Sequence, residues 1–162
     1  ETMLRQGTWW VPTLALVPMS VAHRAKDKAW SDLALADEES KEAKILRAME
    51  KQVPLWKDAV RRGVKVAMGT DQSHRLLVGE NMVELEWMVN WLGMSPMQAI
   101  VSATGTAAEC IRQPELGTLE PGKVADVLVV EGDPLDDIRV LQDRERLKLI
   151  MQAGKAYKNS LG

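Results

Sequence analysis

The chain has 162 residues, of which 46% are hydrophobic and 27% charged, and these values are typical of a globular domain with a sizeable core. Its 21 basic residues are interspersed among 23 acidic ones, and the formal net charge of -2 argues against a nucleic-acid partner. A single cysteine, Cys110, excludes an intrachain disulfide and a zinc site of four thiolates, and it favours a reducing, cytoplasmic compartment.

The first feature along the chain is an uncharged segment, Gly7–Ala22, which loosely resembles the apolar region of a secretory signal. Pro12 and Pro18 interrupt it, and it is too short for a membrane-spanning helix, so no membrane partner is expected. β-Branched and aromatic residues dominate Thr8–Leu14, which predicts a strand covered on both faces in a parallel sheet.

A helix and a second strand are expected next, after a long loop over Pro18–Asp37. Glu38–Arg62 begins with acidic residues and ends with basic ones, which predicts one helix that Pro54 should kink. Val64–Met68 is a short apolar run and predicts a strand. The order strand, helix, strand indicates a βαβ crossover with parallel strands.

Three further helices are predicted in the middle of the chain. The first covers Asn81–Leu92, with Asn81 as N-cap and Glu84 at the spacing of a capping box. The second begins at Ser95, which acts as N-cap before Pro96, and the third covers Gly105–Ile111.

From Gly117 onward the pattern changes to a small β layer. Turn residues at Pro121-Gly122 and Ala153-Gly154 separate the apolar runs. Asp126, Asp133 and Asp136 are placed in turns of the β layer and are interpreted as structural. The predicted strands are Ala125–Val130, Lys148–Gln152 and Ala156–Lys158.

The stretch Gly69-Thr70-Asp71 places a carboxylate directly after the second predicted strand. An aspartate there either makes a local Asx-turn with its own backbone or presents its carboxylate to a site. The triplet alone leaves both interpretations open.

Three stretches together resemble a known family: Gly69-Thr70-Asp71 after a strand, "GMSPMQAIVSATGTAAECI" and "LGTLEPGKVADVLVVEGDPLDDI". They are similar to the C-terminal part of the amidohydrolase superfamily, in particular its prolidase-like and imidazolonepropionase-like metal-dependent hydrolases. The resemblance covers nearly the whole chain and is weakest over the predicted loop.

The resemblance implies an α/β fold, namely about the last two βα units of a (β/α)₈ TIM-type barrel plus part of a β-sandwich. Residues 1–116 would belong to the barrel and residues 117–162 to the sandwich. Such barrels carry one or two divalent ions at their C-terminal mouth, with zinc as the expected metal. Asp71 then matches the last metal ligand of the family, which also accepts a proton from the activated water and passes it to the leaving nitrogen.

Two loop residues are candidate substrate contacts. His74 lies close to Asp71 in the sequence, and Arg75 is suited to an anionic group, although both also fit an exposed loop without a role. The family often has a His-Gly pair slightly further on, where this chain has Val78-Gly79, and this departure weakens the transfer of a substrate-binding histidine. His23 is expected on the surface.

The other metal ligands of the family have no counterpart here, because the chain has only two histidines and no His-x-His pair. We therefore expect a fragment that is inactive alone and associates with the missing barrel portion or forms a homo-oligomer, since two parallel strands leave open edges. The predicted function is hydrolysis of C–N bonds in small molecules, with Xaa-Pro dipeptides as one substrate class. The alternative is a non-catalytic remnant that serves as an oligomerising module.

Overall fold

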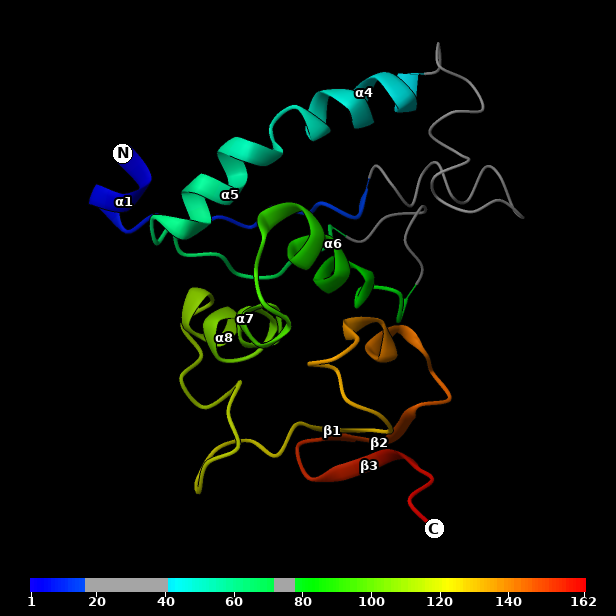
Figure 1. The fold of residues 1–162 in the computed structure, drawn as a ribbon. Helices are drawn as coiled ribbons and strands as arrows, with labels where there is room; N and C mark the ends of the chain where they lie inside the picture. Colours follow the sequence, from blue (N-terminus) through cyan, green and yellow to red (C-terminus); the bar gives the residue numbers. More distant parts are fainter. Residues whose placement is uncertain (17–40, 72–77) are drawn as a thin grey trace.

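The computed structural model describes residues 1–16, 41–71 and 78–162, and helices and a small sheet are stacked along one direction (Figure 1). Helix α6 lies centrally and contacts α5 on one side and α7 on the other, while the sheet and the C-terminus occupy the far end (Figure 1). The helices are α1 (Thr2–Gln6), α4 (Lys41–Glu50), α5 (Val53–Arg61), α6 (Val83–Leu92), α7 (Pro96–Ala103), α8 (Gly105–Cys110) and the 3₁₀ helix η1 (Ile138–Gln142); the strands are β1 (Val127–Val130), β2 (Leu147–Gln152) and β3 (Lys155–Asn159).

The two strands predicted in the first half are reduced to one parallel bridge between Trp10 and Val66. The predicted parallel direction is confirmed, but the predicted strand lengths are wrong. The first segment leaves the extended conformation at Thr13, whose φ is 48°, and a turn follows at once. No further strand lies beside this bridge among the described residues, and a lone pair of strands is only marginally stable, which accounts for the short pairing.

The single helix predicted over residues 38–62 is also wrong in part, because the chain breaks at Lys51 and Gln52 between α4 and α5. Pro54 lies in the first turn of α5. A proline in a helix interior lacks the N–H for the i−4 carbonyl and its ring clashes with it, so the helix ends and restarts instead of kinking. The predicted loop at 18–37 lies outside the described residues.

The start of α6 differs from the prediction, whereas the start of α7 confirms it. Helix α6 begins at Val83, and Asn81 and Glu84 form no capping box. At α7, the Gln98 N–H donates to Ser95 Oγ at 3.2 Å and the Ser95 N–H donates to Gln98 Oε1 at 2.8 Å. Ser95 is therefore the N-cap, and Pro96 occupies the first turn as expected.

The C-terminal sheet is antiparallel throughout, in the order β1-β2-β3, and it confirms the three predicted strands within a few residues at each end. Ile150 pairs with Leu128 on one side and with Lys158 on the other. Asp126 stabilises the β2–β3 turn, because its carboxylate accepts the Ala153 N–H at 2.8 Å. Its structural role is thus as predicted.

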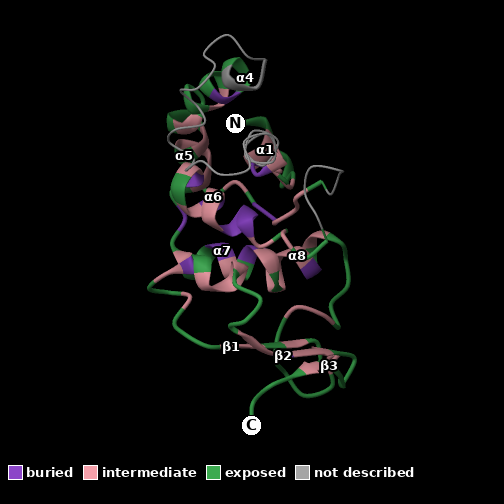
Figure 2. Ribbon diagram, turned by 90° about the vertical axis from the view of Figure 1, so that its right-hand side faces the viewer, coloured by how far each residue is buried: buried purple, intermediate pink, exposed green. Residues whose placement is uncertain are grey.

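The buried residues gather around α6 and α7 (Figure 2). Leu85, Met88 and Leu92 of α6 are almost fully buried, together with Leu14. Indole rings extend this core: Trp56 lies 6.2 Å from Trp10 and 6.1 Å from Trp91 between ring centroids, and Trp91 contacts Trp87 edge-on at 4.6 Å. None of the helices within residues 1–16, 41–71 and 78–162 is long and apolar enough to cross a bilayer.

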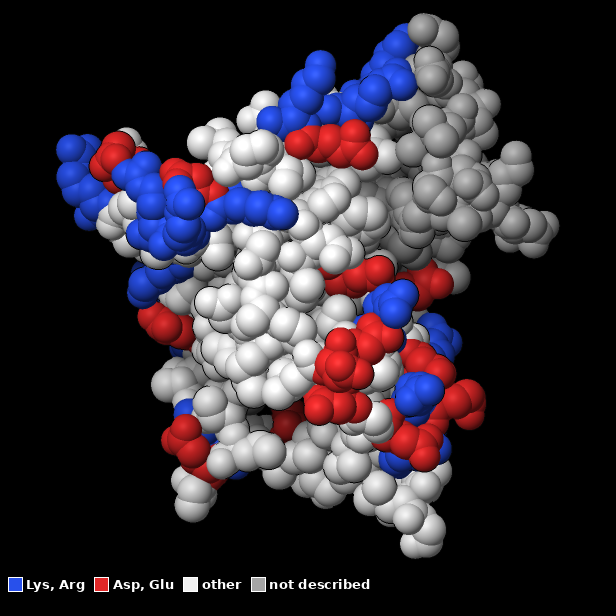
Figure 3. All heavy atoms as spheres, in the orientation of Figure 1, with Lys and Arg blue, Asp and Glu red and all other residues white. Residues whose placement is uncertain are grey.

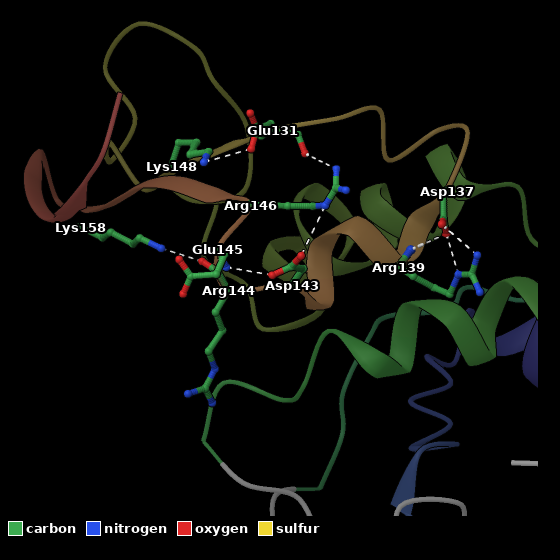
Figure 4. Close-up of polar contacts among 9 residues, drawn as sticks. All are labelled: Glu131, Asp137, Arg139, Asp143, Arg144, Glu145, Arg146, Lys148 and Lys158. Carbon is green, nitrogen blue, oxygen red and sulfur yellow. Dashed lines mark hydrogen bonds and ion pairs between the residues drawn. The ribbon is translucent and has the colours of Figure 1, made fainter. Parts of the chain in front are cut away.

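Polar contacts connect residues within the β layer (Figure 4), and others join the layer to the helical part. The Arg144 guanidinium donates to the Val78 carbonyl at 2.9 Å, and the Gln142 amide donates to the Glu86 carboxylate at 2.8 Å. Within the layer, Arg139 donates from Nε and Nη2 to the two carboxylate oxygens of Asp137. The layer is therefore anchored beside the start of α6.

Candidate active site

The parallel bridge at Trp10 and Val66 defines the edge on which a site can be built. The Trp10 N–H donates to the Lys65 carbonyl at 2.8 Å, and the Ala67 N–H donates to the Trp10 carbonyl at 3.1 Å. Because the two segments are parallel, they leave the bridge toward the same edge. The residues after Trp10 and the residues after Val66 thus approach one another there.

Gly69 allows this close approach. A Cβ at residue 69 would lie 2.6 Å from Val11 Cγ1, so a larger residue would push the two segments apart. The glycine of the Gly-Thr-Asp triplet therefore has a packing role that the sequence alone did not indicate.

Asp71 stands at the end of the second segment. Its side chain is exposed, and its backbone is left-handed with φ 50°, a conformation that aspartate tolerates better than most residues. This conformation turns the chain out of the strand direction at the carboxylate. The N–H that an Asx-turn would use belongs to a residue outside the described ranges, so both interpretations of Asp71 stay predictions.

The other predicted site residues, His74 and Arg75, also lie outside the described residues, as does His23. The positions of the two proposed substrate contacts relative to Asp71 are therefore not described. Their roles stay predictions.

A second carboxylate, Glu84 in the first turn of α6, is fully buried. Its Oε1 accepts the Leu14 N–H at 2.6 Å, and its Oε2 accepts the Ala15 N–H at 2.7 Å. Removal from water raises the pKa of the Glu84 carboxyl to about 7, although both hydrogen bonds act in the opposite direction.

The sequence interpretation missed this role for Glu84 and assigned the residue to a capping box. A usable indication was present, because Glu84 lies on the same helix face as Trp87 and Met88. An acidic residue on an apolar face predicts a buried carboxylate with its own hydrogen-bond donors. Which donors it meets depends on a segment about 70 residues away in sequence.

Across residues 1–16, 41–71 and 78–162, no group of three or more His, Cys, Asp or Glu side chains lies together as a metal site. A single carboxylate cannot hold a catalytic zinc ion, which takes three protein ligands and a water. Asp71 fits a divalent metal as one oxygen ligand, exposed and following a strand segment. The described residues thus supply one candidate ligand and no complete set.

Comparison with known proteins identifies the family. The family model described as "Amidohydrolase family" matches residues 1–157. The chain belongs to the amidohydrolase family. This amidohydrolase chain is 30% identical to ochratoxinase of Aspergillus niger over 164 aligned residues, which cover 98% of the chain and 31% of ochratoxinase. It is also 30% identical to imidazolonepropionase of Pyrobaculum arsenaticum over 99 residues, covering 60% of the chain and 25% of the relative.

Solved structures agree with this assignment. The crystal structure of A. niger ochratoxinase matches 97% of the amidohydrolase chain with a TM-score of 0.70. A Xaa-Pro dipeptidase with methionine bound in its active site matches 97% of the chain and 36% of its own, at 32% identity and a TM-score of 0.69. The chain spans about a third of the length of these relatives. The resemblance to the C-terminal part of this superfamily is confirmed, as is a mixed α/β fold that aligns with that portion.

Proposed function

We propose that residues 1–162 form the C-terminal part of a metal-dependent amidohydrolase that cleaves C–N bonds, with Xaa-Pro dipeptides as the first substrates to test. Residues 1–116 would contribute the last two βα units of a (β/α)₈ barrel, and residues 117–162 would contribute to a β-sandwich. The observation that carries the proposal is the Trp10–Val66 parallel bridge, whose second segment leads to Asp71 in a chain 32% identical to a Xaa-Pro dipeptidase.

In this proposal, Asp71 is a metal ligand and a proton shuttle. A divalent ion, zinc in the first instance, would supply an activated water when bound with ligands from the rest of the barrel. The Asp71 carboxylate accepts the proton of the attacking water and delivers it to the leaving nitrogen. Its exposure at the end of a strand segment supports this role, because barrel enzymes keep their catalytic groups at that end of their strands.

His74 and Arg75 are proposed to contact the substrate, with Arg75 gripping an anionic group such as a carboxylate. Both follow Asp71 closely in the sequence. In a cytoplasmic hydrolase of small molecules, such groups would orient the substrate and leave the chemistry to the metal ligands.

The rest of the barrel is the proposed partner of this chain. A cavity of about 390 Å³ lies between residues 64–66 and α7, and Met97 and Val101 on its lining are 51% and 44% exposed. Residues other than Lys, Arg, Asp and Glu also cover much of the middle of the face seen in Figure 3, with charged groups around them. Apolar surface of this kind supports contact with further protein.

The test uses the complete hydrolase, with residues 1–162 joined to or assembled with the rest of the barrel. Asp71→Asn keeps the side-chain shape and removes the base, so we expect at least a thousandfold loss of kcat on Xaa-Pro dipeptides. Asp133→Asn is the matched control, since the Asp133 carboxylate accepts the Leu135 N–H at 2.8 Å in a turn of the β layer. Full activity in Asp71→Asn would overturn the role of Asp71.

A wild-type assembly that binds no metal and cleaves no C–N bond would instead favour the alternative, a non-catalytic oligomerising module. Metal analysis and size-exclusion chromatography of the same preparation distinguish the two functions.

A further inference from the structure

The buried side chain of Glu84 has no role in the proposed catalytic steps. Its carboxylate is fully buried, yet both of its oxygens are engaged by backbone N–H groups, at 2.6 Å from Leu14 and 2.7 Å from Ala15. A carboxylate can accept two such bonds at once, whereas a glutamine side chain has one acceptor oxygen and would face the second N–H with its own donor. Glutamate can therefore satisfy both N–H groups, whereas glutamine can satisfy only one of them.

The segment that Glu84 holds is conformationally strained. Thr13, directly before the two donors, has φ 48°, and a β-branched residue rarely adopts this left-handed conformation. Such a conformation persists only when the surroundings hold it. Here the bonds to Leu14 and Ala15 hold the turn immediately after the strained residue, and both residues are buried.

The same segment borders the edge at which Asp71 stands. Trp10 and Val66 form the parallel bridge, and Val11 touches the position where Gly69 has no side chain. The chain after Trp10 and the chain leading to Asp71 are therefore still in contact beyond the bridge. Glu84 thus joins one border of this edge to α6.

Among the described residues, the contacts of Glu84 are explained without a second charged side chain. Helix α7, which packs on α6, contains no titratable residue, and the next acidic residue of α6, Glu86, binds Gln142 of η1. Glu84 is thus occupied by the backbone of one segment. Its contacts fix the position of that segment relative to α6 and connect to no charge network among the described residues.

We propose that Glu84 is a positioning residue: its buried carboxylate fixes the Leu14–Ala15 turn against α6 and so sets the edge of the site that Asp71 occupies. This inference rests on the proposed hydrolase function. Glu84 acts through the backbone it holds and contacts no reacting atom. A misplaced edge would weaken the alignment of substrate with the catalytic carboxylate.

The experiment compares Glu84→Gln with Glu86→Gln in the complete hydrolase. The two variants make the same change on the same helix, but only the first removes an acceptor from Leu14 or Ala15. Three quantities are measured for each: metal content, kcat and KM on a Xaa-Pro dipeptide, and hydrogen–deuterium exchange of the peptide containing Leu14 and Ala15. Glu84→Asp is a second variant that keeps the charge but shortens the reach, and it replaces Glu84→Gln if that protein does not fold.

We expect Glu84→Gln to exchange faster at residues 14–15, to keep the wild-type metal content and to lose about tenfold or more in kcat/KM. Glu86→Gln should match the wild type in all three. If Glu84→Gln exchanges faster but keeps kcat/KM within twofold of the control, Glu84 is only structural and the proposal is overturned, while the hydrolase function stands. If the wild type itself cleaves no C–N bond, both the proposed function and the positioning role are overturned.

Discussion

The helical part around α6 and the antiparallel sheet β1–β3 are stabilised in different ways. Most of the buried side chains lie in the helical part, and its contacts join segments far apart in sequence, such as Leu14 and Glu84. In the sheet, by contrast, Leu149 alone is buried among the strand residues the structure describes, and β2 pairs with the strand that follows it directly. The candidate site thus depends on side-chain packing between distant segments, whereas the sheet depends on backbone pairing between its strands.

The largest expected effect comes from truncating the core. Leu85 is 1% exposed and Leu128 of β1 is 44% exposed. We expect Leu85→Ala to lower the free energy of unfolding by about 3 kcal/mol, because it leaves a cavity. Leu128→Ala should cost less than about 1 kcal/mol. Urea unfolding followed by tryptophan fluorescence measures both, and equal losses would contradict the difference between the two regions.

Because Glu84 is buried in the helical part, we expect the free energy of unfolding to depend on pH. The folded pKa of Glu84 is about 7 against an ordinary 4.5, so the folded protein holds this proton more tightly than the unfolded chain. The contribution to stability is complete below pH 4.5 and is lost as the pH rises through about 7. Relative to Glu84→Gln, the wild type should lose roughly 3 kcal/mol over this window.

Urea unfolding of both proteins from pH 4.5 to 8 tests this difference, with Glu86→Gln as the control that keeps the wild-type pH profile. A constant difference between wild type and Glu84→Gln across the window would show that Glu84 does not titrate there.

Substituting Gly117 tests how the chain between the helices and the β layer packs against α7 and α8. A Cβ on Gly117 would lie 2.6 Å from the Thr104 carbonyl oxygen and 2.9 Å from Ala108 Cβ, at φ 84°. Gly154 in the β2–β3 turn has φ 79° but nothing within 4 Å. Gly117→Ala should therefore cost about 2 kcal/mol and Gly154→Ala about 1 kcal/mol, since only the first adds a clash to the backbone strain. Thermal unfolding measures the two, and equal losses would rule out the clash.

A smaller effect is expected at the capping box of α7. Ser95→Ala removes the acceptor of the Gln98 N–H and should cost about 1 kcal/mol. Gln98→Ala removes the reciprocal bond to the Ser95 N–H and should cost less, because that N–H is exposed to water. Urea unfolding of both variants checks this order.

The smallest effect is expected in the sheet's surface ion pairs. Lys148 Nζ lies 3.0 Å from Glu131 Oε2, and both side chains are partly in solvent. Lys148→Ala should change the free energy of unfolding by less than about 1 kcal/mol, and the change should shrink at high salt. A loss of several kcal/mol, insensitive to salt, would remove the distinction between a packed helical part and a locally paired sheet.

Features that depend on neighbouring residues could be predicted from the sequence. The capping box at Ser95, the turn at Ala153-Gly154 and the three sheet strands follow from side-chain chemistry within a few positions. The motifs after Gly93 likewise identified the family, and the Gly-Thr-Asp triplet singled out Asp71 as a candidate ligand.

Features that join distant segments depend on the tertiary fold and could not be predicted from local sequence. The length of the parallel pairing, the close approach of Val11 to Gly69 and the burial of Glu84 against Leu14 and Ala15 each need a partner that local pattern cannot name. A glutamate three residues after an asparagine has the same local pattern whether it caps its own helix or binds another segment. Burial explains why Glu84 binds the other segment, since removing a carboxylate from water is tolerated only where hydrogen-bond donors from elsewhere in the fold meet it.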